Sequence, residues 1–195
     1  EMTTNTYDAL TVKQEASRCL ACHLFCDVCV SVCPNRANIS YETTPRTWHL
    51  PPGSHGVVQN FVIEQKMQVA NIKDYCNECG NCVTFCPTAG RPFADKPRLA
   101  LTCETFEAEP ETHWLQKNTT HYELYFSTAE GKGVLRAASP CAEGFTFEWQ
   151  GASGFIRWED FALIDIDGSY EKIDFAFLAQ RAVLLEAFVR GTLIL

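Results

Sequence analysis

The sequence has little positive charge and no long apolar run. Sixteen Lys and Arg residues stand against 24 Asp and Glu residues, which gives a formal charge of −8. A chain this acidic lacks the basic surface that non-specific binding of nucleic acid or of an anionic membrane requires. Near the C-terminus, Arg181, Glu186 and Arg190 interrupt the most apolar stretch, so no segment approaches the ~20 residues of a membrane-spanning helix. We therefore expect no nucleic-acid partner and no membrane span, and a protein partner with a basic docking surface.

Signatures of catalysis and of nucleotide binding are also missing. The chain has neither a G-x-G-x-x-G nor a G-x-x-x-x-G-K-[ST] pattern, and its short glycine-rich pieces read as hairpin turns. The five histidines are scattered, without a spacing that indicates a Ser-His-Asp or Cys-His arrangement. We expect no independent catalytic site. Nothing resembles a signal peptide, so a reducing cytoplasmic location is expected.

Cysteine, in contrast, is abundant and concentrated. There are 11 cysteines, and most of them fall into two groups. The second group is CNECGNCVTFCP, in which Cys76, Cys79, Cys82 and Cys86 have the C-x2-C-x2-C-x3-C-P spacing of bacterial proteins with two [4Fe–4S] clusters. In that arrangement three thiolates bind one cluster and the fourth binds the other. The pattern therefore requires a partner motif elsewhere in the chain.

This partner motif lies upstream, in CLACHLFCDVCVSVCP. In chain order it is the first motif, and the group from Cys76 to Cys86 is the second motif. When the later group is shifted back by 53 residues, its last three cysteines superpose on Cys26, Cys29 and Cys33. Its first cysteine, Cys76, then falls one residue after Cys22. Cys22 fits this register better than Cys19, although the spacing rule tolerates either residue. Cluster 1 is thus predicted to be held by Cys22, Cys26, Cys29 and Cys86, and cluster 2 by Cys76, Cys79, Cys82 and Cys33.

Other interpretations of the cysteines remain open. Two four-cysteine sites can hold zinc, although structural zinc sites usually separate their ligand pairs by a dozen or more residues. The metal centres can also be purely structural, in which case the chain is an interaction or regulatory subunit. Cys103 and Cys141 have no second thiol nearby and are expected to be small core residues.

The predicted fold class is α+β, in two parts. Residues 1–106 are expected to form a bacterial-type two-cluster ferredoxin fold, with a lead-in helix over 9–20 and a long loop over 43–56. Within this part, residues 57–64 and 67–73 are predicted to form a hairpin.

The second predicted part is a docking unit behind an acidic linker. The linker spans 107–121, and residues 122–195 are expected to form a small antiparallel sheet with a C-terminal helix. That helix is predicted over 175–190, with Asp174 as its N-cap and Gly191 as its stop signal.

Three segments resemble a known family. They are EASRCLAC, DVCVSVCPNRAN and DYCNECGNCVTFCPTAGRPFADK, and they are similar to the C-terminal iron–sulfur region of the YgfK-type selenate reductase family. The resemblance implies a two-cluster electron relay attached to an NAD(P)H-oxidising flavoprotein core similar to dihydropyrimidine dehydrogenase. Because this chain has no dinucleotide fingerprint, FAD and NAD(P)H are expected only on a partner subunit or domain. The implied function is single-electron transfer to or from that flavin-containing oxidoreductase.

Overall fold

The computed structural model describes residues 26–138 and 143–195. The helix predicted over 9–20 lies outside these residues, as do Cys19, Cys22 and Cys141.

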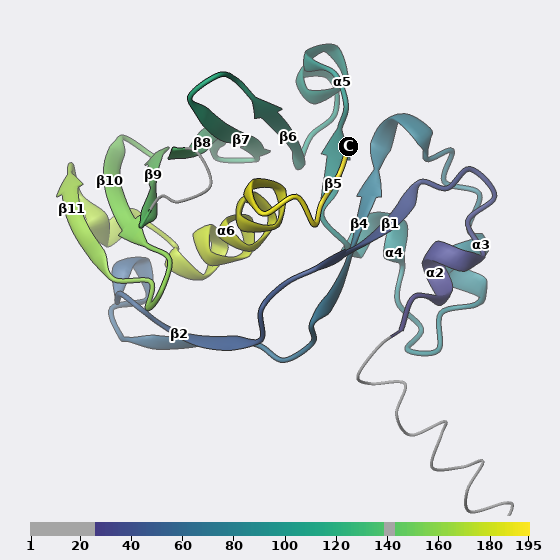
Figure 1. The fold of residues 1–195 in the computed structure, drawn as a ribbon, viewed down its shortest axis with the longest axis horizontal. Coiled ribbons are helices and arrows are strands. Elements are labelled where there is room, and N and C mark those ends of the chain that lie inside the picture. The colour runs from purple at the N-terminus through teal and green to yellow at the C-terminus, as the bar shows by residue number, and fades with distance from the viewer. Residues whose placement is uncertain (1–25, 139–142) are drawn as a thin grey trace, which may run out of the picture.

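The chain is built around one mixed sheet of nine strands, which curls around a long helix (Figure 1). In spatial order the strands are β1 (Asn38–Glu42), β4 (Met67–Ile72), β5 (Arg98–Ala100), β6 (Thr112–Lys117), β7 (His121–Thr128), β8 (Gly131–Ala138), β9 (Gly144–Trp149), β10 (Ala152–Arg157) and β11 (Leu163–Asp167). Strand β5 pairs in parallel with both β4 and β6, and all other neighbours in this sheet are antiparallel.

This sheet overturns the predicted fold class. A bacterial-type two-cluster ferredoxin fold followed by a separate small sheet was expected, but the strands after the cysteine motifs continue the same hydrogen-bonded ladder as β1 and β4. The physical reason lies in β5 and β6, where Leu99 pairs with His113 and Ala100 with Trp114. Strand β6 lies within 107–121, the segment predicted as a linker. The division of the chain into units at 106 and 121 stays a prediction.

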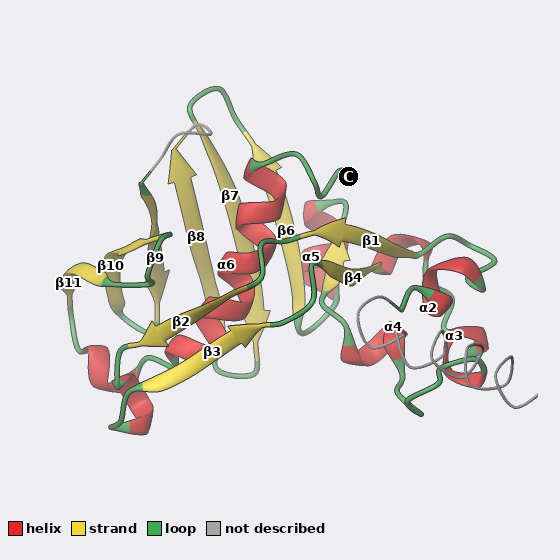
Figure 2. Ribbon diagram, turned by 60° about the horizontal axis from the view of Figure 1, so that its bottom comes forward, coloured by secondary structure: helices red, strands yellow, loops and turns green. Residues whose placement is uncertain are grey.

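The predicted hairpin of residues 57–64 and 67–73 is also wrong. Strand β3 (Gln59–Ile63) pairs with β2 (Arg46–Leu50), whereas β4 pairs with β1. Strand β2 lies inside 43–56, which was expected to be a loop, and the short 3-10 helix η2 (Gly53–His55) follows it. The β2–β3 ribbon is separate from the large sheet and crosses α6 on the side away from that sheet (Figure 2).

The C-terminal helix is confirmed. Helix α6 spans Phe175–Val189, and the Asp174 side chain accepts a hydrogen bond of 3.0 Å from the backbone N–H of Phe177. Gly191 follows the helix at φ 71°, a left-handed conformation that glycine adopts without a steric penalty. Most of α6 is buried because it lies between the sheet and the β2–β3 ribbon (Figure 2).

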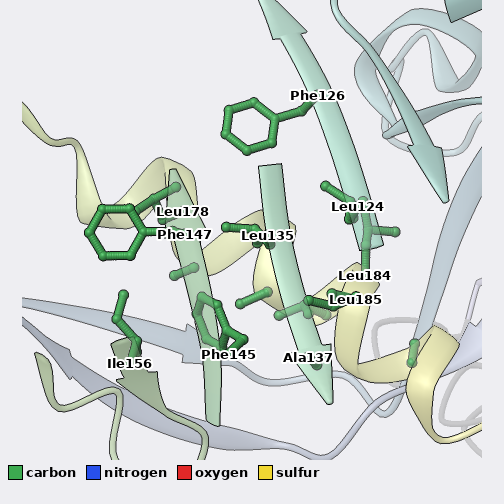
Figure 3. Close-up of a cluster of buried hydrophobic side chains, with 14 of the residues drawn as sticks. Leu124, Phe126, Leu135, Ala137, Phe145, Phe147, Ile156, Leu178, Leu184 and Leu185 are labelled. Carbon is green, nitrogen blue, oxygen red and sulfur yellow. The ribbon is translucent and has the colours of Figure 1, made fainter. Parts of the chain in front are cut away.

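The main core fills the space between α6 and the sheet. Figure 3 shows Leu124, Leu135 and Phe147 from the sheet facing Leu178 and Leu185 from α6, and each of these side chains is almost fully buried. Burying a side chain of this size contributes about 1.5–3 kcal/mol. The core therefore ties the C-terminal helix to the middle of the sheet.

The remaining helices are short. They are α2 (Val28–Ser31), η3 (Lys73–Tyr75), α3 (Asn81–Thr84), α4 (Pro92–Asp95), α5 (Cys103–Ala108) and η4 (Tyr170–Lys172). Helices α2, α3 and α4 lie together beyond the ends of β1 and β4, away from α6 (Figure 1). Both cysteine motifs belong to this end of the molecule.

Candidate metal centre

The 53-residue repeat of the sequence is also a repeat in the structure. Helices α2 and α3 begin and end at positions 53 residues apart. After each helix the chain makes the same turn, in which the N–H of Arg36 donates to the carbonyl of Cys33 at 3.2 Å and the N–H of Ala89 donates to that of Cys86 at 3.2 Å. Arg36 and Ala89 have φ angles of 53° and 55°. Two equal turns thus present the last cysteine of each motif.

In both turns a backbone N–H group points at the cysteine sulfur. The N–H of Ala37 donates to Cys33 Sγ at 3.2 Å, and the N–H of Gly90 donates to Cys86 Sγ at 3.3 Å. The hydroxyl of Thr88 also lies 3.3 Å from Cys86 Sγ. The hydrogen bond with Thr88 lowers the pKa of the Cys86 thiol, and the Gly90 N–H acts in the same direction. The turn at Cys86 therefore favours the thiolate that metals bind.

Four predicted ligands line one cavity. Cys33 lines a small cavity, with about 280 Å³ of space between atoms when open solvent is included, together with Cys76, Cys79 and Cys82. This is the set of residues expected for cluster 2, including the cysteine from the other motif. The rest of the wall includes Asn38, Asn71, Gly80 and Phe93.

The loop that carries Cys76 and Cys79 is held at both ends. Asp74 accepts hydrogen bonds from the N–H of Leu101 at 2.8 Å and from the hydroxyl of Thr105 at 2.6 Å. Lys73 donates to Glu78 at 2.7 Å. Glu78 and Gly80 have φ angles of 56° and 81°, so the chain turns tightly between the cysteines. These contacts position the loop against β4, β5 and α5.

Two buried asparagines join this cavity to the first motif. Asn38 donates to the carbonyl of Cys29 at 2.9 Å, and Asn71 donates to the side-chain oxygen of Asn38 at 2.8 Å. Both side chains are at least 98% buried, and Asn71 Oδ1 is buried without a hydrogen-bond partner. The sequence analysis did not single out either residue. Asn38 is the last residue of the CPNRAN segment, and this segment was the sequence signal that pointed toward it.

Three of the four residues predicted for cluster 1 are described. Cys29 packs against Cys82 and Val69 in a small apolar cluster at the contact of α2 with α3. Burial raises the pKa of the Cys29 thiol, whereas the Lys96 ammonium acts to lower it. Lys96 also acts to lower the pKa of Cys86, so these two predicted ligands share a cationic neighbour. Cys26 is exposed, and Cys22 lies outside the described residues.

The described residues do not present a site for a single metal ion. Within 26–138 and 143–195, no three His, Cys, Asp or Glu side chains converge on one point as ligands of one ion would. A [4Fe–4S] cube differs from a single ion because each thiolate binds a different iron. The four cysteine sulfurs in the wall of the cavity are the soft donors that iron–sulfur clusters take. The residues present therefore fit this group.

Cys103 does not belong to either set. It was expected to be a small core residue, but it is exposed in the first turn of α5. That position leaves it as an accessible thiol away from the cysteine turns.

About half of the chain is similar to a longer protein. It is 40% identical over 96 residues to "Putative oxidoreductase YgfK" of Escherichia coli strain K12, and equally to the protein of that name in Escherichia coli O157:H7. The match covers 49% of this chain but only 8% of each relative. This similarity supports the YgfK-type family that the cysteine segments indicated.

The other comparisons found no relatives. No family model matches the chain, and no solved structure matches it. In the part of the chain that the structure describes, no helix has the length and apolar character needed to cross a membrane.

Proposed function

We propose that this chain is an electron-transfer module of an oxidoreductase, which relays single electrons through two [4Fe–4S] clusters. The cavity lined by Cys33, Cys76, Cys79 and Cys82 carries the proposal. The cavity brings one cysteine of the first motif beside three of the second, as the exchange of the fourth ligand between two clusters requires. The similarity to a protein named as an oxidoreductase agrees with this role.

Each cluster, when bound, supplies a centre that gains and loses one electron. Cys76, Cys79, Cys82 and Cys33 would hold one cluster, and Cys26, Cys29 and Cys86 would hold the other together with Cys22 or Cys19. The N–H groups of Ala37 and Gly90 donate hydrogen bonds to the sulfurs of Cys33 and Cys86 and orient them. Val30, Val32, Val83 and Phe93 pack on the buried cysteines and limit the access of water.

Exposed aromatic side chains indicate where a redox partner docks. Phe85, next to Cys86, is 57% exposed, and Tyr75, next to Cys76, is 52% exposed. Aromatic residues are enriched at protein interfaces. We propose that this surface meets a flavin-containing oxidoreductase subunit or domain with basic residues at its rim, and that FAD and NAD(P)H bind to that partner.

Metal analysis and magnetic resonance test the proposal. Protein purified without oxygen should contain about eight irons and eight sulfides per chain, and reduction with dithionite should give the EPR signal of two interacting clusters. Zinc in place of iron, or fewer than about six irons per chain, would contradict the relay. Iron without a reducible signal would favour a structural role for the clusters.

A further inference from the structure

A second pocket lies between the sheet and α6, apart from the cysteine cavity. It contains about 820 Å³ of empty space, open solvent included, and its lining spans the turn before β5, strand β6, the end of β7 and one side of α6. The polar residues that matter are Lys96, Arg98, His113, Ser127 and Arg181. None of the cysteines predicted as ligands lines it.

Three cations in the pocket make no close ion pair. Among the residues that the structure describes, no carboxylate lies within 4 Å of the charged atoms of Lys96, Arg98 or Arg181. Two carboxylates, Asp95 and Glu111, also line the pocket; Asp95 pairs with Arg91, and Glu111 acts on Arg181 only from a longer distance, in the direction that raises its pKa. In a chain with a net charge of −8, three cations without a close ion pair in one pocket are unexpected.

Arg181 is the least satisfied of these cations. Its guanidinium lies 3.2 Å from the centre of the Phe177 ring, and one Nη donates to the backbone oxygen of Phe177 and to the side chain of Gln180. Its Nε is buried without a hydrogen-bond partner. Desolvation lowers the pKa of Arg181 to about 10. A buried charge of this kind is normally paired, because desolvation without a partner costs free energy.

Two neutral groups complete the lining. The Nδ1 of His113 lies 3.0 Å from the carbonyl oxygen of Arg98, and since a carbonyl only accepts, Nδ1 carries the proton and Nε2 is an acceptor. The Ser127 hydroxyl accepts a hydrogen bond from the N–H of Thr112 at 3.3 Å, which leaves its own proton to donate. The pocket thus offers cations, a neutral donor and a neutral acceptor, next to the carboxylates of Asp95 and Glu111.

We propose that this pocket binds a small oxyanion, the carboxylate or phosphate group of a small molecule, with Arg181 as its main partner and Lys96 and Ser127 as supporting donors. Arg181 supplies several N–H donors in a planar fork that matches the oxygens of either group. Phe177 holds the fork in place by stacking. This inference does not depend on the clusters, because it concerns residues outside both cysteine sets.

Calorimetric titration of the full chain tests the site. The probes are inorganic phosphate and malonate, added at constant ionic strength at pH 7. We expect saturable binding of at least one probe, and at least about tenfold weaker binding by Arg181→Gln, since a hydrogen-bonded charge contributes about 1.5–3 kcal/mol. Arg181→Lys should bind with intermediate affinity because it keeps the charge and loses the fork. Binding of phosphate alone or malonate alone would identify which group the site prefers, and either result supports it.

Lys117→Gln is the matched control, because Lys117 is an exposed cation on β6 outside the pocket. It should leave the affinity unchanged. Absence of saturable binding of both probes would overturn the proposal. So would equal weakening by Arg181→Gln and Lys117→Gln, which would mean that any lost positive charge has the same effect. Circular dichroism checks that each variant is folded. If Arg181→Gln does not fold, Arg181→Lys still tests the role of the guanidinium fork.

Discussion

Cys33 belongs by sequence to the first cysteine motif, but it lines the cavity of the second. The turn after α2 accounts for this placement, because Arg36 adopts a left-handed conformation and the Ala37 N–H binds the Cys33 sulfur. In the corresponding turn after α3, the N–H of Gly90 donates a hydrogen bond to the Cys86 sulfur. In each turn a single backbone N–H thus orients the sulfur of the last cysteine of the motif.

Changing Cys33→Ser should damage the cluster assigned to Cys76, Cys79 and Cys82, and not the one assigned to its own motif. The reason is that its sulfur faces their cavity. Iron content should fall by up to about half, and EPR should lose the interaction between the two reduced centres. Cys103→Ser is the control, since Cys103 is an exposed thiol on α5 and should change neither measurement. Loss of only the upstream cluster would contradict the assignment.

His113 makes stability depend on pH. Burial lowers its pKa to about 3, from an ordinary value near 6.5. The unfolded chain therefore binds a proton that the folded chain excludes as the pH falls from about 6.5 toward 3, so stability decreases through that window by at most about 1.4 kcal/mol per pH unit. His113→Gln keeps a donor for the Arg98 carbonyl and removes this titration.

Urea unfolding at several pH values checks the effect. The free energy of unfolding of His113→Gln should fall less steeply between pH 6.5 and pH 4 than that of the unchanged protein. His49→Gln provides the control, because His49 is exposed on β2 and contacts Asn60. A parallel decrease for the unchanged protein and His113→Gln would show that other groups cause the pH dependence.

Among the elements, the β2–β3 ribbon depends most on contacts distant in sequence. Trp48 is fully buried and lies 4.9 Å from the ring of Phe161, measured between centres. Arg46 makes two hydrogen bonds with Glu186 of α6, at 2.8 and 2.9 Å, and the Glu186 side chain is only 7% exposed. Arg190 pairs with the same carboxylate at 2.6 Å. The tilted ring contact holds the ribbon against the β10–β11 connection, and the ion pair, in which one Arg46 nitrogen bonds both Glu186 oxygens, holds it on α6.

Replacing Arg46→Gln should destabilise the protein by about 2 kcal/mol. The change removes a bidentate partner from a buried carboxylate, which costs more than losing a surface pair, and Arg190 limits the loss. Urea unfolding measures the difference. Arg157→Gln breaks the exposed Arg157–Asp160 pair and should cost clearly less than Arg46→Gln, because solvent screens an exposed pair. Equal costs for the two variants would contradict the importance of the ribbon contact.

At the scale of the whole molecule, the parallel strands β4, β5 and β6 join the cysteine end to the rest of the sheet. Strand β5 is short, yet Leu99 and Ala100 are almost fully buried. Residues on either side of 106 therefore share one core and one hydrogen-bonded ladder. This continuity makes the stability of the two ends interdependent.

We expect Leu99→Ala to destabilise the whole protein. Truncating a fully buried leucine typically costs about 2–5 kcal/mol. Hydrogen exchange should show that the amides of β4 and of β8 lose protection together, because they open in one cooperative unit. Ile164→Ala on β11 is the control, since Ile164 is 56% exposed and should cost little. Loss of protection at β4 with β8 unchanged would instead support an independent unit over 1–106.

Local signals predicted local structure well. The cap at Asp174 and the stop at Gly191 predicted the boundaries of α6. Both ends of this helix form as predicted because the residues that determine them are neighbours in the chain.

Strand pairing was not predictable in the same way. The sequence alone determined the two cysteine turns, because the cysteine spacing and the proline within each motif are local properties. The two motifs repeat after 53 residues, and the structure has the same backbone hydrogen bonds in both turns. Only the tertiary structure decided that β3 joins β2, that β5 and β6 extend the sheet of β1 and β4, and that Lys96, His113 and Arg181 meet in one pocket. Strands satisfy their backbone groups with any compatible edge, and the edge that each one finds depends on the packing of α6 and the core.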